Sequence, residues 1–115
     1  MRLTSQIWVS AYLRRCASEA VPAVVLRRGN AEAGAIFISV DRLDGMLHLY
    51  EPAPTGLNGS DTSRFWVRCF GGEAATEEDV ATYIARQLKF DPDLWVIAIE
   101  DRQGRHFLEG DLIEV

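Results

Sequence analysis

Cysteine and lysine are both scarce in this sequence of 115 residues. Its two cysteines, Cys16 and Cys69, lack a neighbouring cysteine or histidine at the spacing of a zinc site or a redox pair. We therefore expect no metal site, and we expect each cysteine to be a small buried apolar residue. Lysine supplies only one of the twelve cationic side chains, and no glycine-rich segment precedes it, which excludes a Walker-type phosphate loop.

Long hydrophobic runs are also missing. No stretch approaches the ~18 apolar residues of a membrane span, and the first residues lack the apolar run of a secretory signal, so we expect a cytoplasmic protein. The proportions of hydrophobic (48%) and charged (25%) residues are those of a folded domain rather than a disordered chain. We expect one domain, residues 1–115, whose core is large enough to fold without a metal or cofactor.

A basic excess is absent as well, because the net charge is −5. Proteins that bind nucleic acid need clustered cations to contact phosphates, so we do not expect a nucleic-acid partner. The charge is uneven along the chain: residues 1–72 carry eight arginines against six acids, and residues 73–115 carry four cations against eleven acids. These two parts either attract each other between two copies of the chain or cancel within one fold.

The spacing of apolar residues predicts two helices. The first helix begins after Thr4 or Ser5, either of which can cap it, and its apolar residues recur at steps of three and four as far as Ala20. The second begins after Thr76, which is followed by three acids as in a capping box. The stripe that it should bury consists of Val80, Ala81, Ile84 and Leu88.

Runs of β-branched and aromatic residues predict strands at 23–26, 35–41, 46–51, 64–70 and 94–99, with a last one near 106–108. Asp44-Gly45 predicts a two-residue type I′ turn between the second and third strands. Residues 52–63 form a long polar loop, either a mobile lid or slack. We predict an α+β fold: a single, mainly antiparallel sheet of five to six strands with two helices packed on one face.

Several stretches along nearly the whole chain carry a family resemblance, although none is a chemical motif. They lie at residues 2–5, 8–11, 13–15, 27–29, 32–38, 49–50, 52–54 and 90–96, and include Arg27-Arg28-Gly29, Pro52-Ala53-Pro54 and Phe90-Asp91-Pro92-Asp93. In these stretches the chain resembles the bacterial domain-of-unknown-function family fourteen ninety-one, small alphaproteobacterial proteins of about this length. The resemblance implies a single intracellular α+β domain, and it implies no catalytic or ligand-binding residue.

The predicted hairpin brings polar side chains together. A two-residue turn at Asp44-Gly45 places Asp41 opposite His48 and Ser39 opposite Tyr50, so these four side chains share one face. A hydroxyl, an imidazole and a carboxylate are the groups of nucleophilic catalysis. However, Ser39 would be diagonal to His48, about 7 to 8 Å away, and no nearby helix N-terminus offers an oxyanion hole. A solvated polar face explains the same set without chemistry.

The strand at 64–70 predicts a second cluster, because Arg64, Trp66 and Arg68 alternate onto one face. With Phe37 and Tyr50 they would form an aromatic patch rimmed by cations, suited to a protein contact, an anionic ligand or stacked bases. We expect the protein contact, and therefore a homodimer.

These patterns favour a non-catalytic, self-associating interaction module with the aromatic patch as its contact face. The alternative is a small-ligand-binding protein or a hydrolytic enzyme that uses Ser39, Asp41, His48 and Tyr50 beneath the 52–63 loop.

Overall fold

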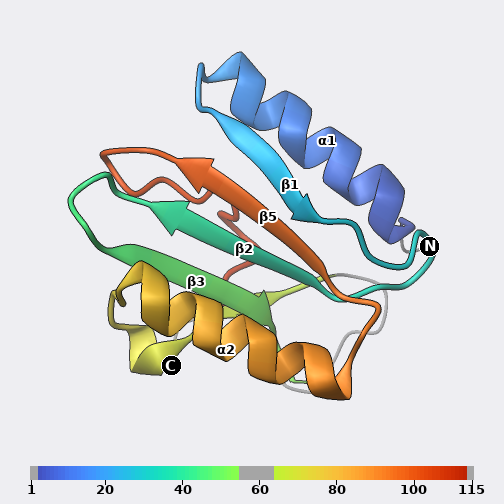
Figure 1. Ribbon diagram of the computed structural model, residues 1–115. Helices are drawn as coiled ribbons and strands as arrows, with labels where there is room; N and C mark the ends of the chain where they lie inside the picture. The colour runs from blue at the N-terminus through green and yellow to red at the C-terminus, as the bar shows by residue number, and fades with distance from the viewer. Residues whose placement is uncertain (1–2, 55–63, 114–115) are drawn as a thin grey trace.

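A five-stranded sheet lies at the centre of the molecule, with one helix on each side of it (Figure 1). The computed structural model describes residues 3–54 and 64–113. In chain order the strands are β1 (Ala23–Arg27), β2 (Ile36–Asp41), β3 (Leu47–Pro52), β4 (Trp66–Arg68) and β5 (Trp95–Glu100). Their order across the sheet is β1-β5-β2-β3-β4. Among the five strands of the described residues, β5 and β2 pair in parallel and the other neighbours are antiparallel, so the predicted α+β class and the mainly antiparallel sheet are confirmed.

Both helices begin where the capping residues predict. Helix α1 (Ser5–Ser18) follows Thr4, whose hydroxyl oxygen accepts a hydrogen bond from the backbone N–H of Ile7 (3.3 Å). Helix α2 (Glu77–Phe90) follows Thr76, whose hydroxyl oxygen accepts from the N–H of Asp79 (3.2 Å). The first turn of α2 also carries three acids, which the helix dipole stabilises at that end. No helix within the described part of the chain is long and apolar enough to cross a membrane.

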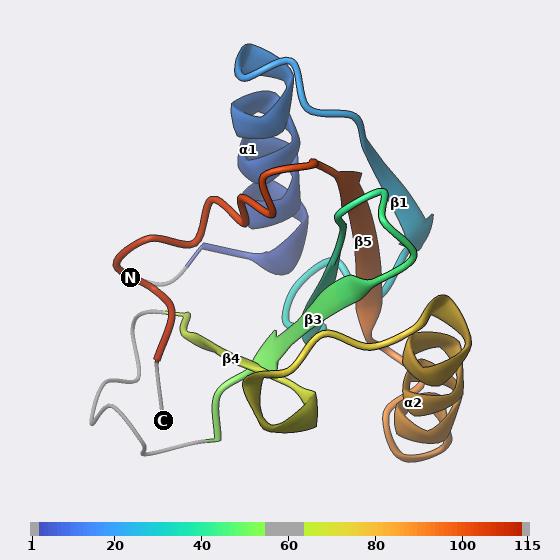
Figure 2. The same ribbon diagram turned by 90° about the vertical axis from the view of Figure 1, so that its left-hand side faces the viewer.

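The two helices cover opposite faces of the sheet, as Figure 2 shows from the side. On β5, Trp95, Ile97 and Ile99 belong to the core under α1, whereas Val96 belongs to the core under α2. The prediction that both helices pack on one face is therefore wrong. A central strand that is apolar on both faces needs cover on both, which is why each face has its own helix.

The last predicted strand, near 106–108, is also wrong. Phe107 and Leu108 are buried in the core under α1, but Phe107 has a φ of +57°, which a strand backbone does not adopt. The strand predicted at 64–70 is shorter, and a 3-10 turn (Phe70–Gly72) follows it. Residues 55–63, the greater part of the predicted loop, lie outside the described residues.

Candidate functional site

The polar residues predicted to share one hairpin face lie on two faces. In the β2–β3 pair, Ser39 is opposite Leu49 and Val40 is opposite His48, one position away from the predicted register. A shift of one residue moves a side chain to the other face of a sheet. Ser39 and Asp41 therefore face the α2 side, whereas His48 and Tyr50 face the α1 side. The predicted register is wrong, and these four residues form no common site.

The connection between β2 and β3 explains the shift. It is longer than a two-residue turn, because the N–H of Arg42 bonds to the carbonyl of Met46 (3.1 Å), and Leu43 and Gly45 both have positive φ. The Asp44 carboxylate accepts a hydrogen bond from the N–H of Met46 (3.0 Å) and pairs with Arg42 (2.9 Å). These side-chain contacts stabilise a wider loop than the Asp-Gly dipeptide alone predicts.

The aromatic patch is likewise divided, and its rings are buried. Trp66 is 1% exposed; its ring lies 4.7 Å from that of Trp8, and its Nε1 donates to the carbonyl of Ile36 (2.9 Å). Tyr50 is fully buried in the same core, whereas Phe37 lies in the core under α2. The prediction of an exposed aromatic contact face is therefore wrong, because these large rings fill the two cores.

The arginines of that patch contact their own chain. Arg64 donates from Nη2 to the carbonyl of Leu3 (2.8 Å) and to the hydroxyl of Ser5 (3.2 Å). Arg68 donates from Nε to the Tyr50 hydroxyl (3.2 Å) and lies 5.7 Å from the centre of that ring. They tie the ends of β4 to α1 and to β3 rather than rim an open platform.

His48 is partly buried on the α1 side of the sheet. Its Nδ1 is buried and has no hydrogen-bond partner among residues 3–54 and 64–113. Desolvation, and then the charges of Arg68 and Arg42, lower the pKa of His48. Ser39 points to the opposite side of the sheet, so His48 cannot take the proton of its hydroxyl.

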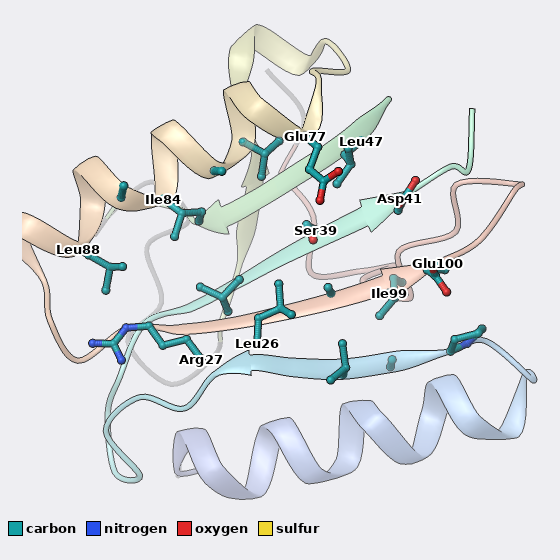
Figure 3. Close-up of a pocket in the computed structure, with 18 residues that line it drawn as sticks. Leu26, Arg27, Ser39, Asp41, Leu47, Glu77, Ile84, Leu88, Ile99 and Glu100 are labelled. Carbon is teal, nitrogen blue, oxygen red and sulfur yellow. The ribbon is translucent and has the colours of Figure 1, made fainter. Parts of the chain in front are cut away.

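An apolar groove lies between α2 and the β1–β5 half of the sheet (Figure 3). It encloses about 690 Å³. Its floor and sides come mainly from small and aliphatic residues, among them Val24, Leu26, Ala81, Ala85, Leu88 and Ala98. Val24 is 54% exposed and Leu26 is 64% exposed, so the side of the groove formed by β1 is open to solvent.

The widths of the elements explain why the groove exists. Helix α2 packs beside β3, and its apolar residues share one core with Phe37, Leu47, Leu49 and Val96. A helix is about 10 Å wide and covers about two strands spaced 4.8 Å apart. A single helix therefore leaves β1 uncovered on this side, where Val24 and Leu26 are exposed, and covers β5 only in part, at Val96.

Charged side chains stand at the two ends of the groove. Asp41, Glu77 and Glu100 lie together at one end in Figure 3, where Asp41 and Glu100 are neighbours in the β2–β5 register. Arg27 lies at the other end beside Leu88, and its Nη2 donates to the carbonyl of Pro92 (2.6 Å). The groove is therefore apolar along its length and acidic at one end.

One polar group lies in the floor of the groove. Ser39 is 4% exposed and lines the groove, and its hydroxyl makes no hydrogen bond with any described residue. Its oxygen is not one of the fully buried unpaired atoms of the described residues, so it is open to the groove and can pair with a group bound there. Within the described residues, no cluster of histidine, cysteine or carboxylate side chains is arranged to hold a metal ion.

Sequence reasoning placed Ser39 and Asp41 in a candidate site but missed the groove around them. The width of the predicted sheet was a signal that could have revealed the groove. Five predicted strands make a sheet about 20 Å wide, and one helix covers only half of one face of it. The apolar run of β1 was a second signal, because its side chains alternate between the two faces of the sheet and those on one face have no helix to cover them.

The comparisons with known proteins identify a family. The model of the family described as "Protein of unknown function (DUF1491)" matches residues 3–109. No curated protein matches the chain.

Solved structures agree with this assignment. The chain is similar to a DUF1491 family protein from Caulobacter crescentus CB15 in its crystal structure (38% identity, TM-score 0.80, covering 98% of this chain and 99% of that one). It is equally similar to an NMR structure of a DUF1491 family protein from the same organism (39%, TM-score 0.79, 98% of each chain). The solution structure of a protein from A. tumefaciens is 36% identical, with a TM-score of 0.74 over 87% of this chain and 86% of that one. The chain therefore belongs to the DUF1491 family.

Proposed function

We propose that this protein is a non-catalytic interaction module and that its binding surface is the groove between α2 and strands β1 and β5. The observation that carries the proposal is the uncovered apolar half of the sheet, where Leu26 is 64% exposed beside the buried Val96. Exposed apolar surface that is continuous with a core is typical of a binding site.

An amphipathic helix is the occupant that fits this surface. The lining residues of α2 extend from Glu77 to Leu88, so the groove is about 17 Å long, the length of a three-turn helix. The α2 side of the groove carries alanine at positions 81 and 85, and small residues allow a second helix to approach to about 8 Å. Helix-in-groove recognition of this kind uses one apolar face of the bound segment.

A second copy of the chain is a poorer occupant, at least through α2. The side of α2 that points away from its own sheet carries Glu78, Thr82 and Lys89, all of which are exposed. Insertion of that side into the groove of another copy would bury charge against Val24 and Leu26, at a substantial desolvation cost. Self-association through some other surface stays a prediction, to be measured by light scattering coupled to gel filtration.

Selection from a phage-displayed library of helical peptides tests the proposal. The selected peptides should bind the parent protein and lose their affinity for Ala85→Trp, in which an indole fills the groove. The matched control is Ala11→Trp, an equally large substitution at an exposed position of α1, on the other side of the sheet. A selection that yields no peptide, or only peptides that bind Ala85→Trp as tightly as the parent, contradicts the proposed function.

A further inference from the structure

The charged residues at the ends of the groove indicate that its occupant carries charged groups as well as an apolar face. Three carboxylates, Asp41, Glu77 and Glu100, gather at one end, and the Asp41 carboxylate already accepts a hydrogen bond from the N–H of Leu43 (2.8 Å). Glu77 and Glu100 are exposed, so each can turn toward a bound side chain without breaking a contact shown among the described residues. An occupant that is apolar throughout would leave this end without cationic partners.

The Ser39 hydroxyl is a second hydrogen-bonding group that is available in the groove, because its oxygen is open to the groove and no described residue pairs with it. Ser39 lies two residues before Asp41 on the same strand face, is almost completely buried, and points into the groove without a hydrogen bond. A bound segment that places a polar group near the carboxylate end can satisfy it. The three carboxylates and the Ser39 hydroxyl both indicate that the occupant has hydrogen-bonding groups at this end of the groove.

From this arrangement we infer that the occupant is an amphipathic helix with lysine or arginine in its last turn, running antiparallel to α2. This inference rests on the proposed function. The basic last turn contacts Asp41, Glu77 and Glu100, and the acidic or neutral first turn lies near Arg27. Cations are stabilised in the last turn of a helix by its dipole, and acids in the first turn, so this direction agrees with the intrinsic stability of the bound helix.

The antiparallel direction of the bound helix also agrees with the distribution of charge along α2. The N-terminus of α2, with Glu77, lies at the carboxylate end of the groove, and its C-terminus, after Leu88, lies at the Arg27 end. An antiparallel neighbour places its C-terminal cations beside the acidic first turn of α2. A helix parallel to α2 would instead place its acidic first turn beside the acidic first turn of α2 and its basic last turn beside the last turn of α2, so like charges would meet at both ends.

Two synthetic peptides of about 14 residues test this inference, with fluorescence anisotropy as the readout; a helix of that length spans the groove. They share an alanine- and leucine-containing apolar face and differ only in the last turn, which carries lysines in one and glutamines in the other. The lysine peptide should bind the parent about tenfold more tightly, which corresponds to 1.4 kcal/mol. This preference should disappear in the double variant Glu77→Gln/Glu100→Gln.

The matched control variant is Glu78→Gln/Glu32→Gln, which removes the same number of exposed charges away from the groove and should keep the preference. Equal binding of the two peptides to the parent, with loss of both on Ala85→Trp, overturns the inference and leaves the proposed function standing. If neither peptide binds, or if both bind Ala85→Trp unchanged, the proposed function fails and the inference fails with it.

Discussion

Leu26 on β1 and Leu88 on α2 line the same groove, far apart in the chain and on opposite sides of an apolar floor. Leu26 contributes little to the core, because most of its side chain is in solvent. Exposure of this apolar side chain to water is unfavourable, and a partner that covers the side chain removes that unfavourable contribution. Its role in the proposed function can therefore be separated from its role in the fold.

Leu26→Asp should abolish peptide binding in the groove while changing the free energy of unfolding by less than about 1 kcal/mol. The reason is that a carboxylate in the groove must be desolvated when a helix covers it. Anisotropy with the lysine peptide and a thermal melt measure the two effects. Ile7→Asp makes the same change at an exposed position of α1 and should leave binding intact; equal loss in both variants would contradict the assigned surface.

Trp66→Ala should lower the free energy of unfolding by about 3 to 5 kcal/mol, because it removes a large buried ring and leaves a cavity beside Trp8. Urea denaturation measures the change. A variant that keeps the stability of the parent would mean that Trp66 is a surface contact residue after all.

Gly45→Val should destabilise the β2–β3 connection by about 1 kcal/mol or more, since Gly45 has a φ of +91° and a β-branched residue resists that conformation. Leu43→Asn should be neutral or stabilising, because asparagine tolerates the positive φ (+63°) found there. Melting midpoints of both variants decide the matter. Equal destabilisation by the two changes would contradict this description of the loop.

The Asp101–Arg105 pair gives a pH dependence of known sign. Arg105 donates to the Asp101 carboxylate from Nε (3.0 Å) and Nη2 (3.1 Å), and these bonds hold the pKa of Asp101 below its usual value. The stabilisation is complete above the pKa of the unfolded chain and is lost as the pH falls through the folded pKa. Asp101→Asn should therefore be less stable than the parent at neutral pH.

The difference in stability between the parent and Asp101→Asn should shrink as the pH falls below the ordinary aspartate pKa of about 3.9 toward the lowered pKa of the folded protein. Urea denaturation across this range measures it. A difference that is constant with pH would show that the carboxylate charge does not stabilise the fold.

The local signals predicted the elements well, and the tertiary arrangement less so. Thr4 and Thr76 cap the two helices as their sequences indicate, and β5 is buried on both faces, as its apolar run indicates. The hairpin register was wrong because Asp41, Arg42 and Asp44 bond to the loop and widen it. Composition could not separate a buried tryptophan from an exposed one. Trp66 is buried against Trp8 of α1, a residue far from it in the sequence.

Mapping of the lysine peptide onto the protein by amide chemical shifts tests the central claim most directly. The account predicts that the largest shifts on peptide addition occur at Leu26, Ala81, Ala85 and Ala98, which line the groove, with those of α1 unchanged. The largest shifts at Val9, Tyr12 or other residues of α1, with those of Ala81 and Ala85 unchanged, would contradict it.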